Sequence, residues 1–325
     1  MLNAAVVGLG WWGQVLARAV HGSSDRIRIV RGITRTPARA AEFAAETGIP
    51  VDADYAAALH DPGIDAVVLA TPHSQHLAQV QAAAAAGKHV FVEKPLALTA
   101  ADAAAAYAAC EAAGVVLAVG QNRRFLPAIR HLREQIAQGT LGHILHLEGN
   151  FSGSSGYRHR PGVWRASAAE SPAGGMTGKG LHVTDLMIAL CGPIREVDAR
   201  SLRQVLEIEM DDTTVMLLGF ASGATGYLGT LTATADVWRL QVFGSEGWAE
   251  MRGHHRLIVK PVTGEAQVLD FPPEDIERAE LEAFAEAVAG GDPFPVDRAQ
   301  VINNIALLEA IGRSAREGRP VTVDA

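Results

Sequence analysis

A lysine at the end of an apolar run is the first residue of this sequence that could carry out chemistry. The run Phe91-Val92-Glu93-Lys94-Pro95 follows Ala86-Gly87-Lys88-His89-Val90, which is typical of a helix end, a glycine cap and the start of a buried strand. A lysine at the carboxyl end of a strand in an α/β sheet points into the crevice where such sheets bind ligands. Lys94 is therefore a candidate catalytic residue; the alternative is that Glu93 and Lys94 simply end the strand in solvent.

Glycines near the start of the sequence predict a dinucleotide site. The short apolar strand Ala4–Val7 runs directly into Gly8-Leu9-Gly10-Trp11-Trp12-Gly13, and residues 14–21 have helical composition. This is the G-x-G-x-x-G pattern in the context that it needs, with a strand before it and a helix after it. The glycines allow a tight turn and a close approach to a pyrophosphate, and the helix N-terminus supplies amide donors. We expect the coenzyme to contact Gly8, Gly10, Trp11, Trp12 and Gly13.

The residues after the second expected strand, Ile27–Ile33, indicate which coenzyme binds. An acidic residue there would accept hydrogen bonds from the ribose hydroxyls and repel a 2′-phosphate. The sequence instead has Thr34 and Arg35, with Arg39 one helical turn further on. A hydroxyl and a guanidinium suit a 2′-phosphate. We predict a preference for NADP(H), with NAD(H) as the second coenzyme; the alternative is a solvated loop that tolerates both.

Strands alternate with helices over the first 120 residues. Helical patterns cover residues 38–47, 54–60, 77–86 and 100–113, and apolar strands cover residues 66–70, 90–92 and 115–119. This alternation predicts an α/β fold with a doubly wound parallel sheet, in which the residues that follow the strands face one crevice. We expect the coenzyme to contact Thr71, Pro72, His73, His76, Glu93, Lys94 and Gln121. A metal pair of His73 and His76 is rejected, because no third ligand accompanies them.

Beyond residue 120 the pattern changes to short strands joined by turns. Polar and apolar residues alternate within these strands, which are expected at residues 143–151, 197–202, 213–220, 224–232, 238–243, 248–251, 257–259 and 267–271. Such strands predict an α+β domain with a large, mostly antiparallel open sheet. Helical patterns at residues 274–289 and 296–317 close the chain. We therefore divide it into domains at residues 1–120 and 121–325.

Two stretches of the second domain could form a site. Residues 152–175 are irregular and rich in Gly, Ser, Arg and His, and an ordered domain rarely keeps so long an irregular segment unless it serves a function. The helical pattern at residues 184–190 places His182 and Asp185 near its first turn, where they could share one face. The alternative is that His182 is a core histidine whose ring nitrogens are hydrogen-bonded within the protein, and that Asp185 is a carboxylate at the helix start.

Composition excludes several classes of protein. The formal net charge of −8 argues against a nucleic-acid partner, and no apolar run is long enough to span a membrane. The N-terminus has no basic leader, so we expect no signal peptide. Cys110 and Cys191 are too few for a disulfide framework and are not spaced as metal ligands. We expect a cytoplasmic protein with reduced cysteines and no bound metal.

Taken together, these motifs resemble the glucose-fructose oxidoreductase, inositol dehydrogenase and rhizopine-catabolism (Gfo/Idh/MocA) family. The resemblance covers essentially the whole chain and rests on the glycine fingerprint, Thr71-Pro72 with His76, the run from Ala86 to Pro95, Arg124-Phe125, and the Gly-x-His-x-x-Asp of Gly180 to Asp185. It implies an oxidoreductase with a Rossmann NAD(P)-binding domain at residues 1–120. It also implies that residues 121–325 bind a sugar or cyclitol and form a homodimer or homotetramer through their sheet.

The resemblance also implies roles for single residues. Lys94 would contact the reacting hydroxyl and take its proton during hydride transfer, His182 would share the proton-transfer work, and Arg124 would lie near the substrate. Family members that act on sugars commonly have an aspartate four residues before the histidine, where this chain has Gly178. Because basic residues surround that position, we expect a substrate with a carboxylate, such as a sugar acid; the alternative is a solvated basic surface. The expected substrate-binding residues are Arg124, Trp164, Arg165, Lys179, His182 and Asp185.

Two other functions fit the same motifs. One is a non-catalytic sensor that binds NADP(H), which the glycine at position 178 favours. The other is a family member that holds its coenzyme tightly and passes hydride between two substrates.

Overall fold

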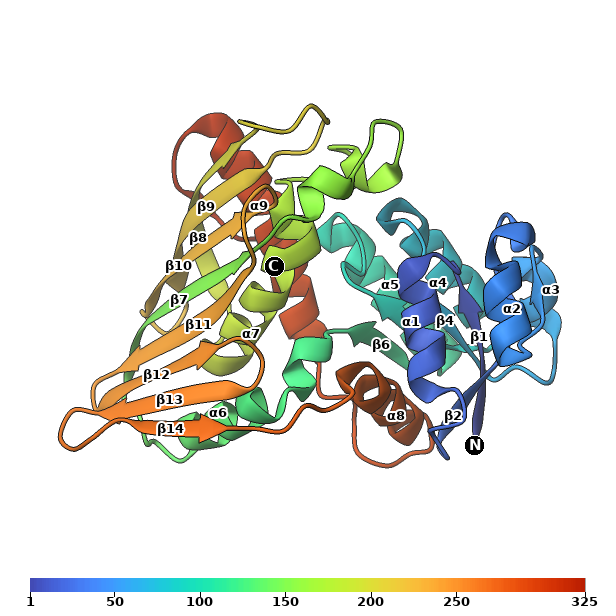
Figure 1. The fold of residues 1–325 in the computed structure, drawn as a ribbon, viewed down its shortest axis with the longest axis horizontal. Coiled ribbons are helices and arrows are strands. Elements are labelled where there is room, and N and C mark those ends of the chain that lie inside the picture. Colours follow the sequence, from blue (N-terminus) through green and yellow to red (C-terminus); the bar gives the residue numbers. More distant parts are fainter. Residues whose placement is uncertain (325) are drawn as a thin grey trace. The chain divides into compact units, whose positions relative to one another are not determined.

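The computed structural model describes residues 1–324, which form two compact units (Figure 1). The first unit comprises Met1–Ala97, Ala101–Asn122 and Asp275–Arg298, and the remaining described residues form the second. Each unit is built around its own sheet. None of the helices formed by residues 1–324 combines the length and the apolar character needed to cross a bilayer.

The sheet of the first unit has six parallel strands in the order β3-β2-β1-β4-β5-β6. The strands are β1 (Leu2–Val7), β2 (Ile27–Ile33), β3 (Val51–Asp52), β4 (Ala66–Leu69), β5 (His89–Glu93) and β6 (Leu117–Gly120). The helices between them are α1 (Trp11–Val20), α2 (Ala41–Thr47), α3 (Tyr55–His60), α4 (His76–Ala85) and α5 (Ala100–Ala113). This strand order is that of a doubly wound dinucleotide-binding sheet. The predicted α/β class is therefore confirmed.

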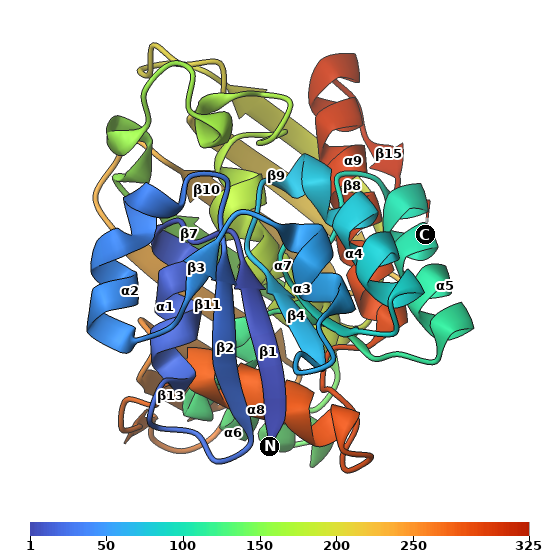
Figure 2. The same ribbon diagram turned by 90° about the vertical axis from the view of Figure 1, so that its right-hand side faces the viewer.

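Burial explains why the strands of this sheet read as continuous apolar runs. All four residues of β4 are buried, and β1 is buried from Ala4 to Val7, as expected for a parallel sheet with both faces covered. The core against β1 and β2 also receives Leu281, Phe284 and Ala285 of α8 (Ile276–Val288), which packs against α1 (Figure 2). Thus α8 completes the core of the first unit, although the sequence divides the chain only once, at residue 121. The assignment of coenzyme and substrate binding to separate domains stays a prediction.

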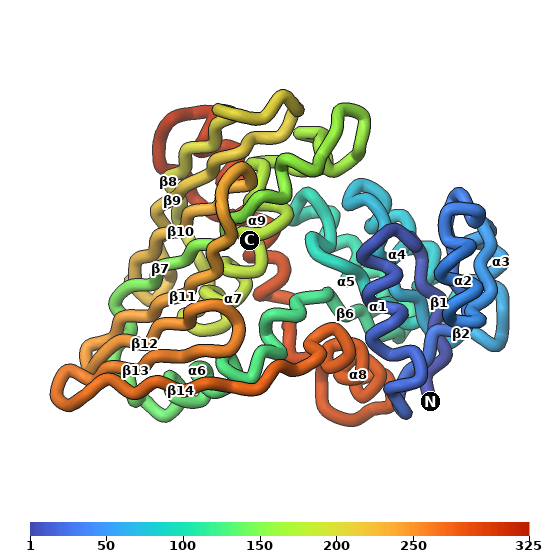
Figure 3. The backbone as a smooth tube through the Cα atoms, in the orientation of Figure 1, coloured from blue at the N-terminus to red at the C-terminus, as the bar shows by residue number. Residues whose placement is uncertain are grey.

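The sheet of the second unit has nine strands in the order β14-β13-β12-β11-β7-β10-β9-β8-β15. Figure 3 traces the backbone through this sheet from β14 to β8. The strands are β7 (Ile144–Ser152), β8 (Ile194–Leu202), β9 (Thr213–Phe220), β10 (Thr225–Leu231), β11 (Val237–Gly244), β12 (Gly247–Arg252), β13 (Arg256–Pro261), β14 (Gln267–Asp270) and β15 (Val321–Thr322). All neighbouring strands are antiparallel except β7 and β10, which run parallel. The predicted, mostly antiparallel sheet is confirmed.

Helix α7 (Leu181–Cys191) packs against one face of this sheet, which we call its inner face; the opposite face is the outer face. A Cβ atom at Gly149 of β7 would press against Val183 and Met187 of α7, so the glycine lets the helix approach closely. Helix α9 (Arg298–Glu317) is tied to α7 by the Thr184 hydroxyl, which donates to Asn304 Oδ1 at 2.6 Å. Helix α6 (Pro127–Ala137) precedes β7. These contacts fix the start of α7, where the candidate histidine lies.

The segment before α7 contains short helical turns. Two are 3₁₀ turns, η4 (Ser155–Arg158) and η5 (Trp164–Ala166), and the third is a π-helical turn, η6 (Met176–Gly180), which continues directly into α7. The helix therefore begins earlier than the pattern at residues 184–190 predicts. Single π-helical turns occur frequently at functional sites.

Candidate active site

The loop after β1 has the geometry of a phosphate-binding loop. Gly8 has a φ of +94°, a value that glycine adopts without strain. A Cβ atom at Gly13 would press against the Gly8 carbonyl, so only glycine lets α1 begin this close to the strand. Gly10 precedes α1 and has no side chain with which to cap it, which leaves the first amides of the helix for an anion. Trp11 is exposed, whereas Trp12 packs against the core of the first unit.

The end of β2 presents the residues that were predicted to select the coenzyme. The Thr34 amide donates to the Asp52 carbonyl at 2.9 Å, and the side chains of Arg35 and Arg39 are exposed. Asp52 lies beside Ile33 on β3, but its carboxylate contacts Arg31 at 3.6 Å and the Asp54 amide at 3.0 Å. The arrangement fits a 2′-phosphate at Arg35 and Arg39, and NADP(H) preference stays a prediction.

The carboxyl ends of β4, β5 and β6 are neighbours along one edge of the first sheet. Glu93 is the last residue of β5, and the residues that follow the three strands along the edge include Thr71, Pro72, His73, Lys94 and Gln121. Glu93 and Gln121 are buried, and the Lys94 backbone amide donates to Glu93 Oε2 at 3.2 Å. The peptide bond between Lys94 and Pro95 is cis. The structure thus brings the predicted coenzyme-contacting residues of three strands to one edge.

His76 holds two of these strand ends together. Its ring is fully buried, with Nδ1 2.8 Å from the Pro95 carbonyl oxygen and Nε2 3.1 Å from the Thr71 carbonyl oxygen. These contacts give His76 a positioning role, since they fix the segments that follow β4 and β5. A direct contact of His76 with coenzyme stays a prediction. No cluster of three His, Cys, Asp or Glu side chains within residues 1–324 could hold a metal.

In the second unit, the side chains of a histidine, a lysine and an arginine lie near the ring of Phe151. The ring of His182, on the first turn of α7, lies 6.2 Å from the Phe151 ring centroid. Lys179 Nζ lies 5.4 Å and the Arg123 guanidinium carbon 5.6 Å from the same centroid. Cations near an aromatic face are attracted by its quadrupole. The candidate histidine and two cationic side chains therefore lie close to one aromatic ring at the end of β7.

An aromatic wall extends from Phe151 to the neighbouring strands. Trp238 of β11 lies directly opposite Phe151, and its ring meets that of His254 edge to face at 5.3 Å. Burial lowers the pKa of His254 to about 4, and the charges of Arg123 and His255 act in the same direction. His254 is therefore neutral near pH 7. Phe151 shares the inner face of β7 with Leu147 and Gly149, because side chains alternate along a strand.

Sequence reasoning expected Arg123 to face the crevice with the other residues that follow the strands, but it missed three of these residues: Phe151, Trp238 and His254. The period-two pattern of β7 was the available signal for Phe151, since it puts the ring on the same face as Gly149, against α7. No pattern in the sequence pairs β7 with β11. Trp238 and His254 could therefore be found only from the fold.

Arg124 and Asp185 form a buried ion pair. Arg124 Nε and Nη2 donate to the two carboxylate oxygens of Asp185, each at 2.7 Å, and Nη1 donates to Gln300 Oε1 at 2.6 Å. Both side chains are almost fully buried. This pair joins the segment before α6 to the N-terminal part of α7 and thereby positions the helix that carries His182. Direct contact of Arg124 or Asp185 with a substrate stays a prediction.

The irregular segment carries a basic cluster that is coupled to Lys179. Burial lowers the pKa of Lys179, Asp236 opposes the shift, and Arg158 adds to it. Burial also lowers the pKa of His159, with further contributions from Arg165, Arg158 and Lys179. Because these groups influence one another, the segment and Lys179 form one region of positive charge. The Arg165 guanidinium lies 4.0 Å above the half-buried ring of Trp164, which is thus covered on that face.

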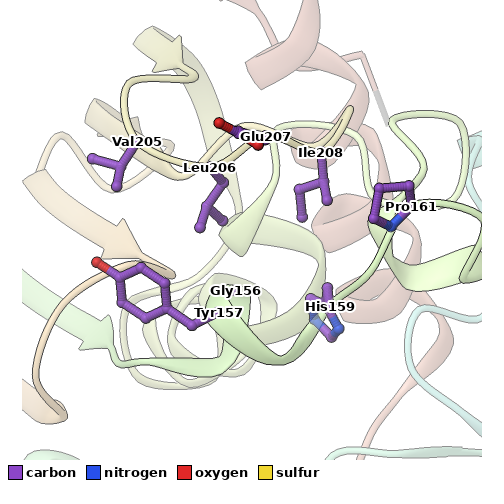
Figure 4. A pocket seen from close by; sticks show the side chains of 8 residues that line it. All are labelled: Gly156, Tyr157, His159, Pro161, Val205, Leu206, Glu207 and Ile208. Atoms are coloured by element: carbon purple, nitrogen blue, oxygen red, sulfur yellow. The ribbon is translucent and has the colours of Figure 1, made fainter.

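A cavity of about 340 Å³ lies beside the same segment (Figure 4). The figure shows Tyr157 and His159 across from the aliphatic side chains of Leu206 and Ile208. His159 also belongs to the basic cluster. The opposite wall is held by Asp212, whose Oδ2 accepts hydrogen bonds from the amides of residues 204–206 at 2.7 to 3.0 Å. None of the cavity's lining residues is His182, Lys179 or Phe151.

Comparison with known proteins shows which family these features define. Residues 2–121 match the oxidoreductase family with an NAD-binding Rossmann fold, and residues 129–250 match the GFO/IDH/MocA C-terminal domain. D-xylose 1-dehydrogenase (NADP(+)) 2 of Haloferax volcanii is 31% identical over 90% of each chain. The scyllo-inositol 2-dehydrogenase (NAD(+)) of Bacillus subtilis is 30% identical over 99% of this chain and 96% of its own.

Solved structures agree with this assignment. The aldose-aldose oxidoreductase of Caulobacter crescentus, complexed with glycerol, superposes with a TM-score of 0.89 at 26% identity and covers 99% of both chains. The glycine loop, the Glu93-Lys94-Pro95 edge and the histidine of α7 all lie within the matched residues. The chain belongs to the Gfo/Idh/MocA family of oxidoreductases.

Proposed function

We propose that this protein is an NAD(P)-dependent dehydrogenase that acts on a secondary alcohol or ketone of a sugar, a cyclitol or a sugar acid. The observation that carries the proposal is the edge of the first sheet, where a dinucleotide-binding glycine loop follows β1 and a lysine follows β5. The similar enzymes named for D-xylose and scyllo-inositol support a polyol or sugar substrate. A bound nicotinamide would accept or donate the hydride.

The residues of the first unit would hold the coenzyme. The amides at the start of α1 would bind the pyrophosphate, and the loop from Gly8 to Gly13 leaves room for its close approach. Thr34, Arg35 and Arg39 would bind a 2′-phosphate, which supports NADP(H) as the preferred coenzyme. Glu93 would contact the ribose or orient Lys94.

Lys94 and His182 would move the protons. Lys94 would take the proton of the reacting hydroxyl as hydride leaves the same carbon, and return it in the opposite direction. His182 would be the second group that transfers a proton or orients the substrate. Its ring centroid lies 6.2 Å from that of Phe151, and the buried pair of Arg124 and Asp185 holds the helix that carries it. A group held in one orientation lowers the entropic cost of reaching the transition state.

We also propose a homo-oligomer, with the outer face of the second sheet as its interface. Leu217 of β9 and Tyr227 of β10 lie opposite each other on this face, and both are exposed. Exposed apolar side chains that cluster on a sheet commonly mark an interaction surface. If a second copy covers the face, Leu217→Glu will shift the mass measured by light scattering towards a smaller species. The free thiols of Cys110 and Cys191 support a reducing compartment, the cytoplasm.

A spectrophotometric survey tests the proposed activity. The purified protein is mixed with NADP⁺ or NAD⁺ and with neutral sugars, cyclitols or sugar acids, and the absorbance of reduced nicotinamide is followed. We expect reduction of the coenzyme with at least one class of compound, at a rate proportional to enzyme concentration. Coenzyme binding without turnover in either direction would contradict the proposal and favour a sensor. Coenzyme that stays bound through gel filtration would indicate hydride transfer between two substrates.

A further inference from the structure

The positive charge around Phe151 is the feature that bears most directly on substrate choice. Lys179 and Arg123 both lie against this ring, at 5.4 and 5.6 Å from its centroid, together with the proposed proton-transfer residue His182. Lys179 is three residues before His182 and belongs to the π-helical turn that leads into α7. A substrate held at His182 would therefore lie beside two cationic groups.

The surroundings of Lys179 leave its charge incompletely balanced. Its amino group lies over Gly153, where an added Cβ atom would contact both Lys179 Nζ and Asp236. Asp236 is the carboxylate that faces Lys179, and it is exposed to solvent, which weakens its effect. Arg158 and Arg165 add positive charge from the irregular segment. Burial and these cations lower the pKa of His159, and His254 is neutral near pH 7. An incoming anion would offset the repulsion among these groups.

The position before Lys179 is open. Gly178 is exposed, and nothing lies within 4 Å of the place that its Cβ atom would occupy. No side chain at this position competes with a substrate for Lys179. The π-helical turn thus carries Lys179 directly after a position with no side chain.

We propose that the substrate carries a carboxylate group, which Lys179 and Arg123 bind beside the ring of Phe151. This inference rests on the proposed dehydrogenase function and narrows its substrate class to sugar acids. The carboxylate would form charge-assisted hydrogen bonds with the two cations, while the alcohol to be oxidised would face His182. Uronates and aldonates have both groups on one short carbon skeleton.

The test compares acids with their neutral counterparts. Binding of D-glucuronate, D-gluconate, D-glucose and D-glucitol to the enzyme–NADPH complex is measured by calorimetry, and kcat/KM is measured with the preferred coenzyme. Lys179→Met should weaken the binding of the acid about ten- to hundredfold, as expected for one charge-assisted hydrogen bond, and weaken that of the neutral compound much less. Lys179→Arg should restore part of the affinity. Lys260→Met, on β13 with its amine on the Gly264 carbonyl, is the matched control and should change neither.

The outcomes separate this inference from the function on which it rests. Equal or better binding and turnover of neutral compounds, or no acid binding at all, would overturn the carboxylate site. The dehydrogenase proposal would then still be decided by the spectrophotometric survey described above. Acid binding that depends on Lys179, with no hydride transfer to or from either coenzyme, would support the carboxylate site and refute the dehydrogenase.

Discussion

The guanidinium group of Arg124 and the carboxylate of Asp185 meet in a buried, bidentate ion pair, with two nitrogen–oxygen distances of 2.7 Å. Gln300 of α9 accepts a third hydrogen bond from Arg124, at 2.6 Å. The pair therefore fixes α7 near its N-terminal end, three residues after His182. A histidine that must present one ring nitrogen to a substrate needs such a fixed helix start.

The first prediction concerns this pair. Asp185→Asn should lower the free energy of unfolding by about 3 to 5 kcal/mol, because it leaves the Arg124 charge buried without its counter-ion. Replacing both residues, as in Arg124→Met with Asp185→Leu, should cost less than Asp185→Asn alone. Urea denaturation measures both effects.

The exposed pair of Arg256 and Asp270 provides the control for this prediction. It has the same 2.7 Å contact, but both side chains are more than half exposed. Asp270→Asn should leave the free energy of unfolding close to that of the wild type. Equal losses for Asp185→Asn and Asp270→Asn would show that burial does not set the strength of the Arg124 pair.

Local patterns predicted most of the helices and strands. The bounds of β2, β9 and α5 agree with the sequence patterns to the residue, since each has a clear period or an apolar run with turn residues at its ends. The two-residue strands β3 and β15 were missed, because two residues have no periodicity. The start of α7 was placed too late, because the glycine-rich π-helical turn before it has poor helix propensity.

Features that depend on distant parts of the chain could not be predicted. The packing of α8 on the first sheet joins residues near position 284 to a core formed by residues before position 120. The pairing of Phe151 with Trp238 depends on the register of β7 and β11, which only the folded sheet defines. Lys94, His182 and the glycine loop could be named as candidates from the sequence because their motifs are local.

The second prediction concerns pH and the wall of the cavity in Figure 4. Burial alone would raise the pKa of Asp212, but hydrogen bonds from the amides of Val205, Leu206 and Gln204 and from the Thr213 hydroxyl outweigh it, and the pKa is lowered. The stabilisation is therefore complete above the unfolded pKa of 3.8 and is lost as the pH falls through the lower folded value. Asp212→Asn should cost about 1 to 3 kcal/mol at neutral pH. The difference from the wild type in urea denaturation should shrink below about pH 4, and a difference that grows there would contradict this account.

The third prediction concerns coenzyme choice. Arg35→Ala and Arg39→Ala should each lower the ratio of kcat/KM for NADPH to that for NADH by about tenfold or more, since each removes a charge-assisted hydrogen bond to the 2′-phosphate. Arg28→Ala is the control, because Arg28 is an exposed arginine near the other end of β2 and bonds to Asn3. If the wild type prefers NADH, the role assigned to Arg35 and Arg39 is wrong.

The fourth prediction concerns Gly178. Gly178→Asp should fold with the stability of the wild type to within about 0.5 kcal/mol, because its side chain enters open space. The new carboxylate would attract Lys179 and repel an acidic substrate, so kcat/KM for the acid relative to its neutral counterpart should fall about tenfold. Gly178→Asn has nearly the same shape without the charge, and it should preserve the ratio. An unchanged ratio in Gly178→Asp would place the substrate carboxylate elsewhere.

The most direct measurement is the effect of Lys94→Ala on coenzyme affinity and on turnover. We predict that NADPH binding, followed by fluorescence titration, is retained while kcat falls by about 10² to 10⁴, the loss expected when a positioned general acid or base is removed. The matched control is Lys88→Met, because Lys88 immediately precedes β5, the strand that Lys94 follows, and its amine contacts the carbonyl oxygens of Asp61 and Ile64 at 2.9 and 2.7 Å. Wild-type turnover in Lys94→Ala would contradict the account, because hydride transfer would then proceed without this proton acceptor.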